Sequence, residues 1–106
     1  LSVLYCKMGD HLTSLGKTEE ASEYYQKFLE AAVPIYQQTG EASVLWNAIT
    51  TYDKLGDNKY TLGLYDEAHS YRLKALELFE QYVKMDPDVQ KYDSYFRDKV
   101  KQGETE

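Results

Sequence analysis

Apolar residues recur at steps of three and four along most of the chain, which is the spacing of one face of an α-helix. This pattern predicts helices over residues 1–15, 18–38, 42–62 and 64–85, and a last helix over 89–101. Asp86-Pro87-Asp88 is expected to end the fourth helix. Nowhere does the sequence show the strict apolar–polar alternation of a half-buried strand. We therefore predict an all-α fold of about five helices.

A proline lies inside the second predicted helix. Pro34 lacks a backbone N–H and clashes with the preceding turn, so the helix either ends near Val33 or kinks there and continues to Gln38. The helix at the equivalent place later in the chain has no proline and a continuous pattern. That comparison favours continuation.

The boundary between the first two helices carries its own signals. Gly16 permits the left-handed turn with which many helices end. Thr18 is predicted to cap the next helix, and Glu19 and Glu20 lie favourably near the positive end of its dipole. A short connection therefore joins two helices into a hairpin.

The sequence repeats itself at a spacing of 47 residues. The first copy contains Tyr5, Met8, Gly9, Gly16, Ala21, Tyr25 and Phe28, and the second contains Tyr52, Leu55, Gly56, Gly63, Ala68 and Ala75. A fixed period of this length indicates stacked supersecondary units. The alignment places Gly56 inside a helix rather than in a turn. A helical glycine costs about 1 kcal/mol relative to alanine, so it implies close packing.

Composition narrows the class of protein. The chain has 106 residues, a hydrophobic fraction of 42% and a net charge of −6. The negative charge disfavours nucleic acids and anionic membrane surfaces as partners, because phosphate binding requires clustered Lys and Arg. No apolar run reaches the length of a membrane span. The single Cys6 cannot form an internal disulfide, which fits a reducing, cytoplasmic location.

The repeated residues resemble the tetratricopeptide repeat. Its pattern of an aromatic residue, Leu-Gly, a second Gly, Ala and further aromatic or small residues is matched over roughly residues 1–85, especially by Leu64-Tyr65-Asp66-Glu67-Ala68. The resemblance implies antiparallel helix hairpins stacked as a short right-handed solenoid. Gly9 and Gly56 would let the helices of a hairpin approach closely, opposite Ala21 and Ala68.

The sequence departs from the family pattern in three ways. Arg72 stands where Tyr25 supplies an aromatic ring, and Thr18 stands where Tyr65 does. The family's usual period is about 34 residues, so a period of 47 implies longer helices, like those in large bacterial repeat proteins. Because the pattern is already under way at Leu1, we expect the chain to be part of a longer array. The expected units are a hairpin at 1–40, a second at 41–87, a capping helix or third-unit start at 88–102, and a disordered tail at 103–106.

In this family the first helix of each unit lines a concave groove, and the resemblance implies which residues face it. Those positions hold Cys6, Asp10, Thr13, Asp53, Asp57 and Tyr60, of which all but Cys6 are candidate partner contacts. The family's clamp for a peptide's terminal carboxylate needs Lys and Asn there, so the clamp is absent. The aspartates would instead give the groove an acidic floor, suited to a basic or amphipathic protein segment.

Catalytic and cofactor motifs are missing from the sequence. Asp66 and His69 have half of the spacing of a di-iron site, but no second pair completes it. We therefore predict a non-catalytic protein-interaction module without cofactor or metal. Two alternatives remain: a structural spacer that self-associates, for example as a homodimer through exposed repeat edges, and a small helical metal protein built around His69.

Overall fold

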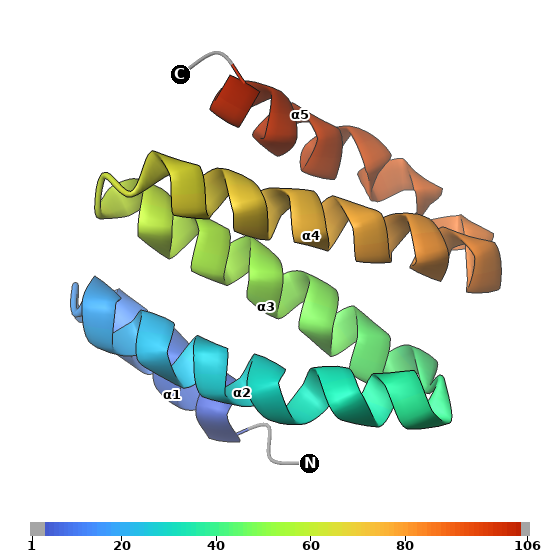
Figure 1. Ribbon diagram of the computed structural model, residues 1–106, viewed down its shortest axis with the longest axis horizontal. Helices are drawn as coiled ribbons and strands as arrows, with labels where there is room; N and C mark the ends of the chain where they lie inside the picture. The colour runs from blue at the N-terminus through green and yellow to red at the C-terminus, as the bar shows by residue number, and fades with distance from the viewer. Residues whose placement is uncertain (1–3, 105–106) are drawn as a thin grey trace.

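The computed structural model describes residues 4–104, which form a layered array of helices without strands in this range (Figure 1). The elements are α1 (Leu4–Ser14), α2 (Thr18–Thr39), α3 (Ala42–Thr61), α4 (Tyr65–Met85), the 3₁₀ helix η1 (Pro87–Tyr92) and α5 (Asp93–Glu104). The predicted all-α class is confirmed. The start of the first predicted helix, at residues 1–3, lies outside the described residues.

Both hairpins turn in the same way. At the end of α1, Gly16 has φ +77° and donates its N–H to the Thr13 carbonyl, while the Lys17 N–H reaches the Leu12 carbonyl. Gly63 has φ +78° and the same two bonds recur 47 residues later, from Gly63 to Tyr60 and from Leu64 to Lys59. This is the Schellman arrangement, which requires a left-handed residue and therefore favours glycine.

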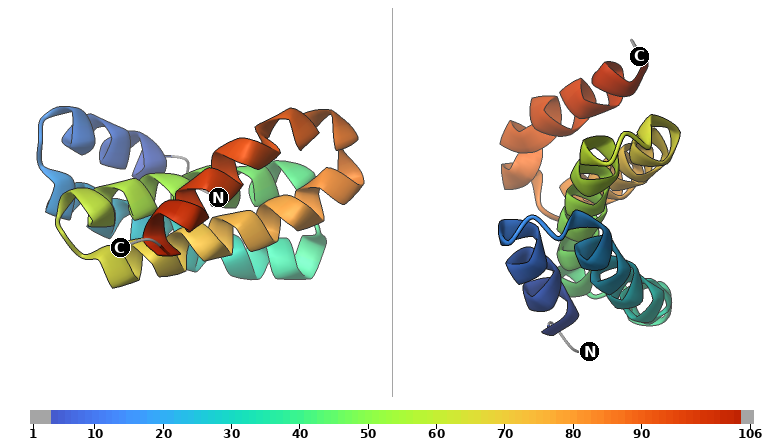
Figure 2. Two further views of the ribbon diagram at one scale, coloured as in Figure 1. Left: turned by 90° about the horizontal axis from the view of Figure 1, so that it is seen from above. Right: turned by 90° about the vertical axis from the view of Figure 1, so that its left-hand side faces the viewer.

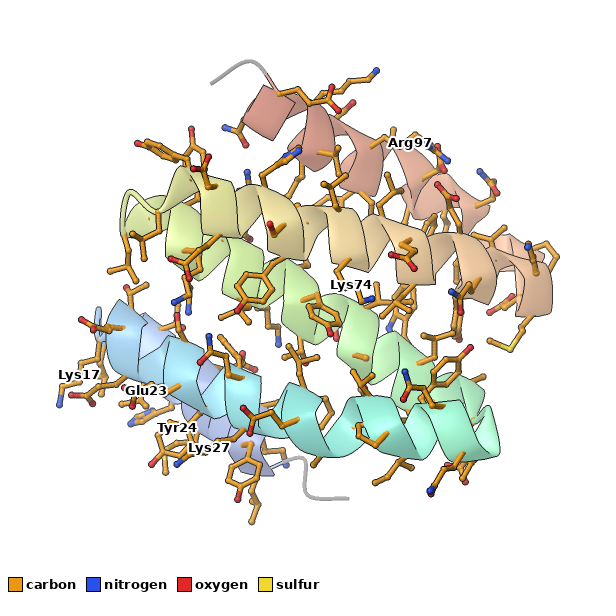
Figure 3. All side chains as sticks on the ribbon, viewed as in Figure 1. Lys17, Glu23, Tyr24, Lys27, Lys74 and Arg97 are labelled. Atoms are coloured by element: carbon orange, nitrogen blue, oxygen red, sulfur yellow. The ribbon has the colours of Figure 1, made fainter. Side chains whose placement is uncertain are left out.

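The cap predicted at Thr18 is wrong. Lys17 is the capping residue of α2 and lies at its N-terminal end (Figure 3), and no side-chain capping bond forms. Thr18 is already helical, because the turn closes so tightly that the next helix begins directly after it. Glu19 and Glu20 do lie in the first turn of α2, where their charge favours the helix dipole.

The second helix continues through its proline. α2 runs unbroken to Thr39 with Pro34 inside it, as the continuity of the equivalent helix suggested. It ends at Gly40, which has φ +68° and donates its N–H to the Tyr36 carbonyl. The boundary between the two hairpins lies at this glycine.

Gly9 and Gly56 are both buried inside helices, as the alignment predicted, and in each case the nearest atom opposite belongs to a large side chain. A Cβ added at Gly9 would lie 2.5 Å from Cε1 of Tyr25, and its three nearest atoms all belong to that ring. One added at Gly56 would lie 3.0 Å from Cγ of Arg72 and 3.4 Å from the Ala68 carbonyl. Each glycine therefore makes room chiefly for the large side chain at one equivalent position of the second helix. By contrast, Gly16 and Gly63 serve the turns and have no packing contact.

The C-terminal part differs from the prediction in two respects. The expected helix over 89–101 is divided into η1 and α5, because Pro87 begins a 3₁₀ turn in which the Asp86 carboxylate accepts the Asp88 N–H. The disordered tail was predicted to begin at residue 103, but Gly103 and Glu104 belong to α5. Gly103 packs against the His69 ring of α4, which holds this end of the helix. Residues 105–106 are outside the described range.

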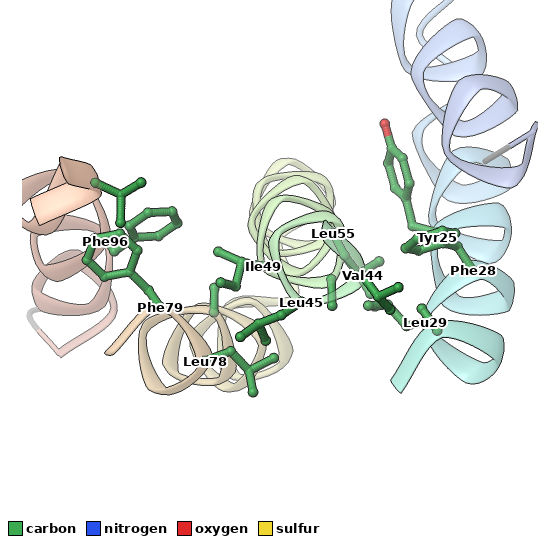
Figure 4. Close-up of a cluster of buried hydrophobic side chains, with 14 of the residues drawn as sticks. Tyr25, Phe28, Leu29, Val44, Leu45, Ile49, Leu55, Leu78, Phe79 and Phe96 are labelled. Atoms are coloured by element: carbon green, nitrogen blue, oxygen red, sulfur yellow. The ribbon is translucent and has the colours of Figure 1, made fainter. Parts of the chain in front are cut away.

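The hydrophobic core is centred on α3, which lies between α2 and α4. Figure 4 shows Leu45, Ile49 and Leu55 of α3 reaching toward both neighbours. Phe28 and Leu29 pack from α2, and Phe79 meets Phe96 of α5 with ring centroids 4.6 Å apart. One apolar core therefore joins both hairpins and the last helix.

The repeat positions are buried to different extents in the two units. Ala21, Tyr25, Phe28, Leu55, Ala68 and Ala75 are buried, and Tyr52 is half-buried. Tyr5 and Met8, predicted to pack, are 38% and 44% exposed. The physical reason is the number of neighbouring helices. α3 packs extensively against both α2 and α4, whereas α1 packs extensively only against α2.

Candidate functional site

The first helices of the units share one side of the molecule. In the end-on view of Figure 2, α1 and α5 project to the same side, with α3 set back between them, while α2 and α4 form the other side. All five predicted contact residues belong to α1 or α3. The α1–α3–α5 face is therefore the natural place to look for a binding surface.

Asp10 of α1 connects three helices. Its carboxylate accepts a hydrogen bond of 2.5 Å from the Tyr25 hydroxyl of α2 and one of 3.0 Å from Nζ of Lys54 on α3. Burial, together with the hydrogen bond to Asp10, raises the pKa of the Tyr25 hydroxyl. Asp10 is thus a structural acceptor as well as an exposed carboxylate.

The second unit repeats this contact with different chemistry. Asp57 is the equivalent of Asp10, and its partner Arg72 is the equivalent of Tyr25. The Arg72 side chain is only 5% exposed; its guanidinium lies 3.2 Å from the Asp57 carboxylate and stacks 4.8 Å above the Tyr60 ring. A buried cation is stable only when it is paired. The departure at Arg72 therefore keeps the repeat contact and replaces a hydroxyl with a charge.

Lys99 of α5 neutralises the two aspartates of α3. Its Nζ lies 2.7 Å from Asp57 and 3.2 Å from Asp53, and Asp53 also accepts a 2.6 Å hydrogen bond from the Tyr95 hydroxyl. Partial burial alone would lower the pKa of Lys99, but the hydrogen bonds to Asp57 and Tyr95 and the two negative charges together raise it. These contacts tie α5 to α3.

Thr13 and Tyr60, the other two predicted contact residues, also have partners within the chain. The Thr13 hydroxyl accepts a hydrogen bond of 3.2 Å from the buried Asn58 amide. The Tyr60 hydroxyl accepts one of 3.3 Å from Gln102, and its ring packs against Tyr65. The face is therefore held together by its own polar side chains.

An aromatic pocket of about 330 Å³ opens on this face between α3 and α5. It is lined by Trp46, Thr50, Asp53, Lys54, Tyr92, Tyr95 and Phe96. The Trp46 ring packs against Tyr82, with ring centroids 5.0 Å apart, and against Tyr92 at 6.1 Å. A mostly apolar hollow with a few polar groups on its rim is the usual form of a ligand pocket.

Among the predicted contact residues only Asp53 lines this pocket. The sequence does contain a signal for the rest, since Trp46, Thr50 and Asp53 share one face of α3 at helical spacing and three aromatic residues follow at 92, 95 and 96. What the sequence could not show is that η1 and α5 fold back onto that face.

Negative charge is unevenly distributed between the two sides. In each of α1, α3 and α5 the acidic residues equal the Lys and Arg residues in number. The helix α2 has four glutamates and one lysine, and α4 has four acidic residues against three basic ones, one of which is the buried Arg72. The excess acid among the helices therefore lies on α2 and α4.

Three other features of the described region bear on function: its metal-ligating side chains, its cysteine and the apolar length of its helices. Between residues 4 and 104 no three His, Cys, Asp or Glu side chains are grouped as a metal site would require. Cys6 shares a 3.2 Å hydrogen bond with Thr51, and burial raises its pKa, which opposes thiolate formation. No helix in this part of the chain is both long and apolar enough to cross a bilayer.

Comparison with known proteins agrees with the repeat geometry. Residues 3–32, which span α1 and the first part of α2, match the family model of the tetratricopeptide repeat. No curated protein and no solved structure matches the chain significantly. The second hairpin reproduces the turn and the glycine–side chain–aspartate contact of the matched one. The first hairpin is therefore similar to a tetratricopeptide repeat, and the described residues form an all-α array of helical hairpins.

Proposed function

We propose that this chain is a non-catalytic protein-interaction module that binds an amphipathic partner segment on the α1–α3–α5 face. Tetratricopeptide repeats are in general protein-interaction modules. The observation that carries the proposal is the aromatic pocket, because a preformed apolar hollow beside exposed polar groups can anchor one side chain of a partner.

The charges on the face favour an amphipathic partner over a purely basic one. Asp10, Asp53 and Asp57 are each paired with a cation of the chain, so a basic partner gains less from them than three free carboxylates would offer. Asp10 and Asp57 still retain 48% and 45% of their side-chain exposure. They can therefore accept hydrogen bonds at the rim while the pocket takes an apolar side chain.

Selection from a random peptide library displayed on phage tests this proposal even when the natural partner is unidentified. We expect the selected peptides to share an aromatic or large aliphatic residue flanked by polar ones. Tyr92→Ser, on the pocket wall, should weaken their binding about tenfold, since an aromatic contact at an interface centre is worth about 1–2 kcal/mol. Tyr65→Ser is the matched control, because Tyr65 is 48% exposed, similar to the 43% of Tyr92, and lies outside the pocket. Equal loss in both variants would contradict the proposal.

Self-association is a second function, favoured by an exposed apolar stripe on α1 and the turn that follows it. Leu4, Met8 and Leu15 are 69%, 44% and 57% exposed, whereas Leu55, the equivalent of Met8, is fully buried between α2 and α4. A helix of a second copy would cover this stripe as α2 covers α3. Sedimentation from micromolar to millimolar concentration tests it. Met8→Gln should abolish a concentration-dependent dimer, and a monomer throughout would exclude this function.

A further inference from the structure

A second hollow surface lies between α2 and α4, on the side away from the α1–α3–α5 face. Figure 1 shows these two helices running side by side with α3 crossing obliquely between them, and residues of α3 form the floor of the hollow. Two adjoining hollows of about 510 and 230 Å³ share Val33. We name this surface the α2–α4 groove; Leu29, Glu30 and Pro34 of α2 line it opposite Tyr71, Glu77 and Leu78 of α4, above Tyr52 of α3.

Two side-chain bridges mark the ends of the groove. The Gln26 amide donates a 3.1 Å hydrogen bond to the Tyr71 hydroxyl, and the Tyr36 hydroxyl donates one of 3.3 Å to the Gln81 amide oxygen. Gln26 and Tyr36 are ten positions apart on α2, which corresponds to about 15 Å along a helix. An extended chain covers about 3.3 Å per residue, so about four residues fit between the bridges.

The first hollow combines acceptors with an aromatic surface. The Glu30 carboxylate has no hydrogen bond or ion pair with any other described residue, and Pro34 has no N–H with which to close the helical bond to the Glu30 carbonyl. Tyr52 and Tyr71 are stacked beside it, with ring centroids 6.2 Å apart. An aromatic face next to free acceptors is suited to a guanidinium group.

The second hollow adds another carboxylate. Glu77 is exposed, and its one ion pair, with Lys74, has a separation of 3.9 Å. Lys74 is labelled in Figure 3, where it lies on the groove side of α4. The pKa of the Tyr52 hydroxyl is raised by burial first, then by Tyr71 and Glu77, so the Glu77 charge acts on the aromatic pair.

We propose that the α2–α4 groove binds a short extended segment of a partner protein, with an arginine side chain over Tyr52 and Tyr71 against Glu30 and a second basic side chain near Glu77. Excess acid on α2 and α4 draws a basic segment to this side, while the balanced charges of α1, α3 and α5 do not. This site is separate from the aromatic pocket, so the two can be tested independently.

Amide chemical-shift mapping of the whole chain with the peptide acetyl-Leu-Arg-Leu-Arg-amide tests the proposal. We expect shifts at residues 26–37 and 71–81, and none at the aromatic pocket. The double variant Glu30→Gln, Glu77→Gln should weaken binding about fivefold, because two partly exposed charge pairs are lost. Lys74→Gln should strengthen binding, since it removes the cation that competes for Glu77. The control is the double variant Glu20→Gln, Glu23→Gln. It changes the net charge by the same amount, but at two positions of α2 that lie outside the groove.

Several results would overturn the proposal. Shifts confined to α3 and α5, equal shifts with acetyl-Leu-Glu-Leu-Glu-amide, or no shift at millimolar peptide would each do so. Equal weakening in the control variant would show attraction by net charge without a site. Shifts at the groove that depend on protein concentration and not on peptide would assign the groove to a second copy of the chain.

Discussion

Replacing Gly9 with alanine should destabilise the protein although alanine is the better helix former. Gly9 is buried in the middle of α1, and the new Cβ would lie 2.5, 2.7 and 2.9 Å from three ring atoms of Tyr25. Carbon atoms in contact are normally 3.5–4.0 Å apart. The ring has little freedom to move, because it is 2% exposed and its hydroxyl is held by Asp10.

The magnitude follows from two opposing effects. Overpacking a well-filled core costs about 1–3 kcal/mol, and the Tyr25 contact belongs at the upper end because three atoms of one ring are involved. Exchanging glycine for alanine in a helix returns about 1 kcal/mol. We therefore expect a net loss of about 1–2 kcal/mol in the free energy of unfolding.

Urea unfolding followed by circular dichroism at 222 nm measures this loss. With a slope of about 1.5 kcal/mol per molar urea, the midpoint should fall by about 1 M. The matched comparison is Gly56→Ala at the equivalent position, where the nearest atom is Cγ of the flexible Arg72 side chain at 3.0 Å. That variant should stay within about 0.5 kcal/mol of the original chain. A Gly9→Ala protein as stable as Gly56→Ala would refute the packing role assigned to Gly9.

Three further predictions concern the polar contacts. Arg72→Met should leave the unfolding free energy within about 1 kcal/mol or raise it, since an apolar side chain of similar length replaces a buried cation while the exposed Asp57 keeps its ion pair with Lys99. Arg72→Ala should lower it by about 2–3 kcal/mol because the buried stem is lost as well, and chemical denaturation of both variants measures the difference. Asp57→Asn should lower the free energy of unfolding by about 1–2 kcal/mol, because Arg72 and Lys99 lose their shared carboxylate. This loss should be smaller in high salt, which thermal unfolding at two ionic strengths would measure. Stability should fall as the pH rises above about 10: the folded-state pKa values of Tyr25 and Lys99 are raised above their ordinary 10.0 and 10.5, so the folded chain retains protons that the unfolded chain releases. Tyr25→Phe should make that decline shallower in unfolding curves measured from pH 9 upward, and an unchanged slope would contradict the assignment.

The local features of the fold could be predicted because they depend on neighbouring residues. Helix spacing, the left-handed turns at Gly16 and Gly63, and the helical position of Gly56 all follow from the pattern and the repeat. The cap at Thr18 failed because the Schellman turn brings Lys17 into the capping position. The sequence contains both the turn glycine, Gly16, and the candidate cap, Thr18, and the turn determines at which residue α2 begins.

The candidate site was less predictable because its charges are set by distant partners. The resemblance placed Asp53 and Asp57 on the side of α3 that faces the proposed binding surface, but Lys99, more than 40 residues away, neutralises them. Likewise, the pattern of α3 alone cannot show that Trp46 faces aromatic residues of η1 and α5. The burial of Arg72 also depends on Gly56 and α5 together.

The most direct test of the proposed binding face is the fluorescence of the chain's only tryptophan, which forms a wall of the aromatic pocket. A library-selected amphipathic peptide should shift the Trp46 emission to shorter wavelength as its side chain displaces water from the pocket. The shift should saturate at the dissociation constant that anisotropy gives for the same labelled peptide. Binding measured by anisotropy with unchanged Trp46 emission would contradict the account.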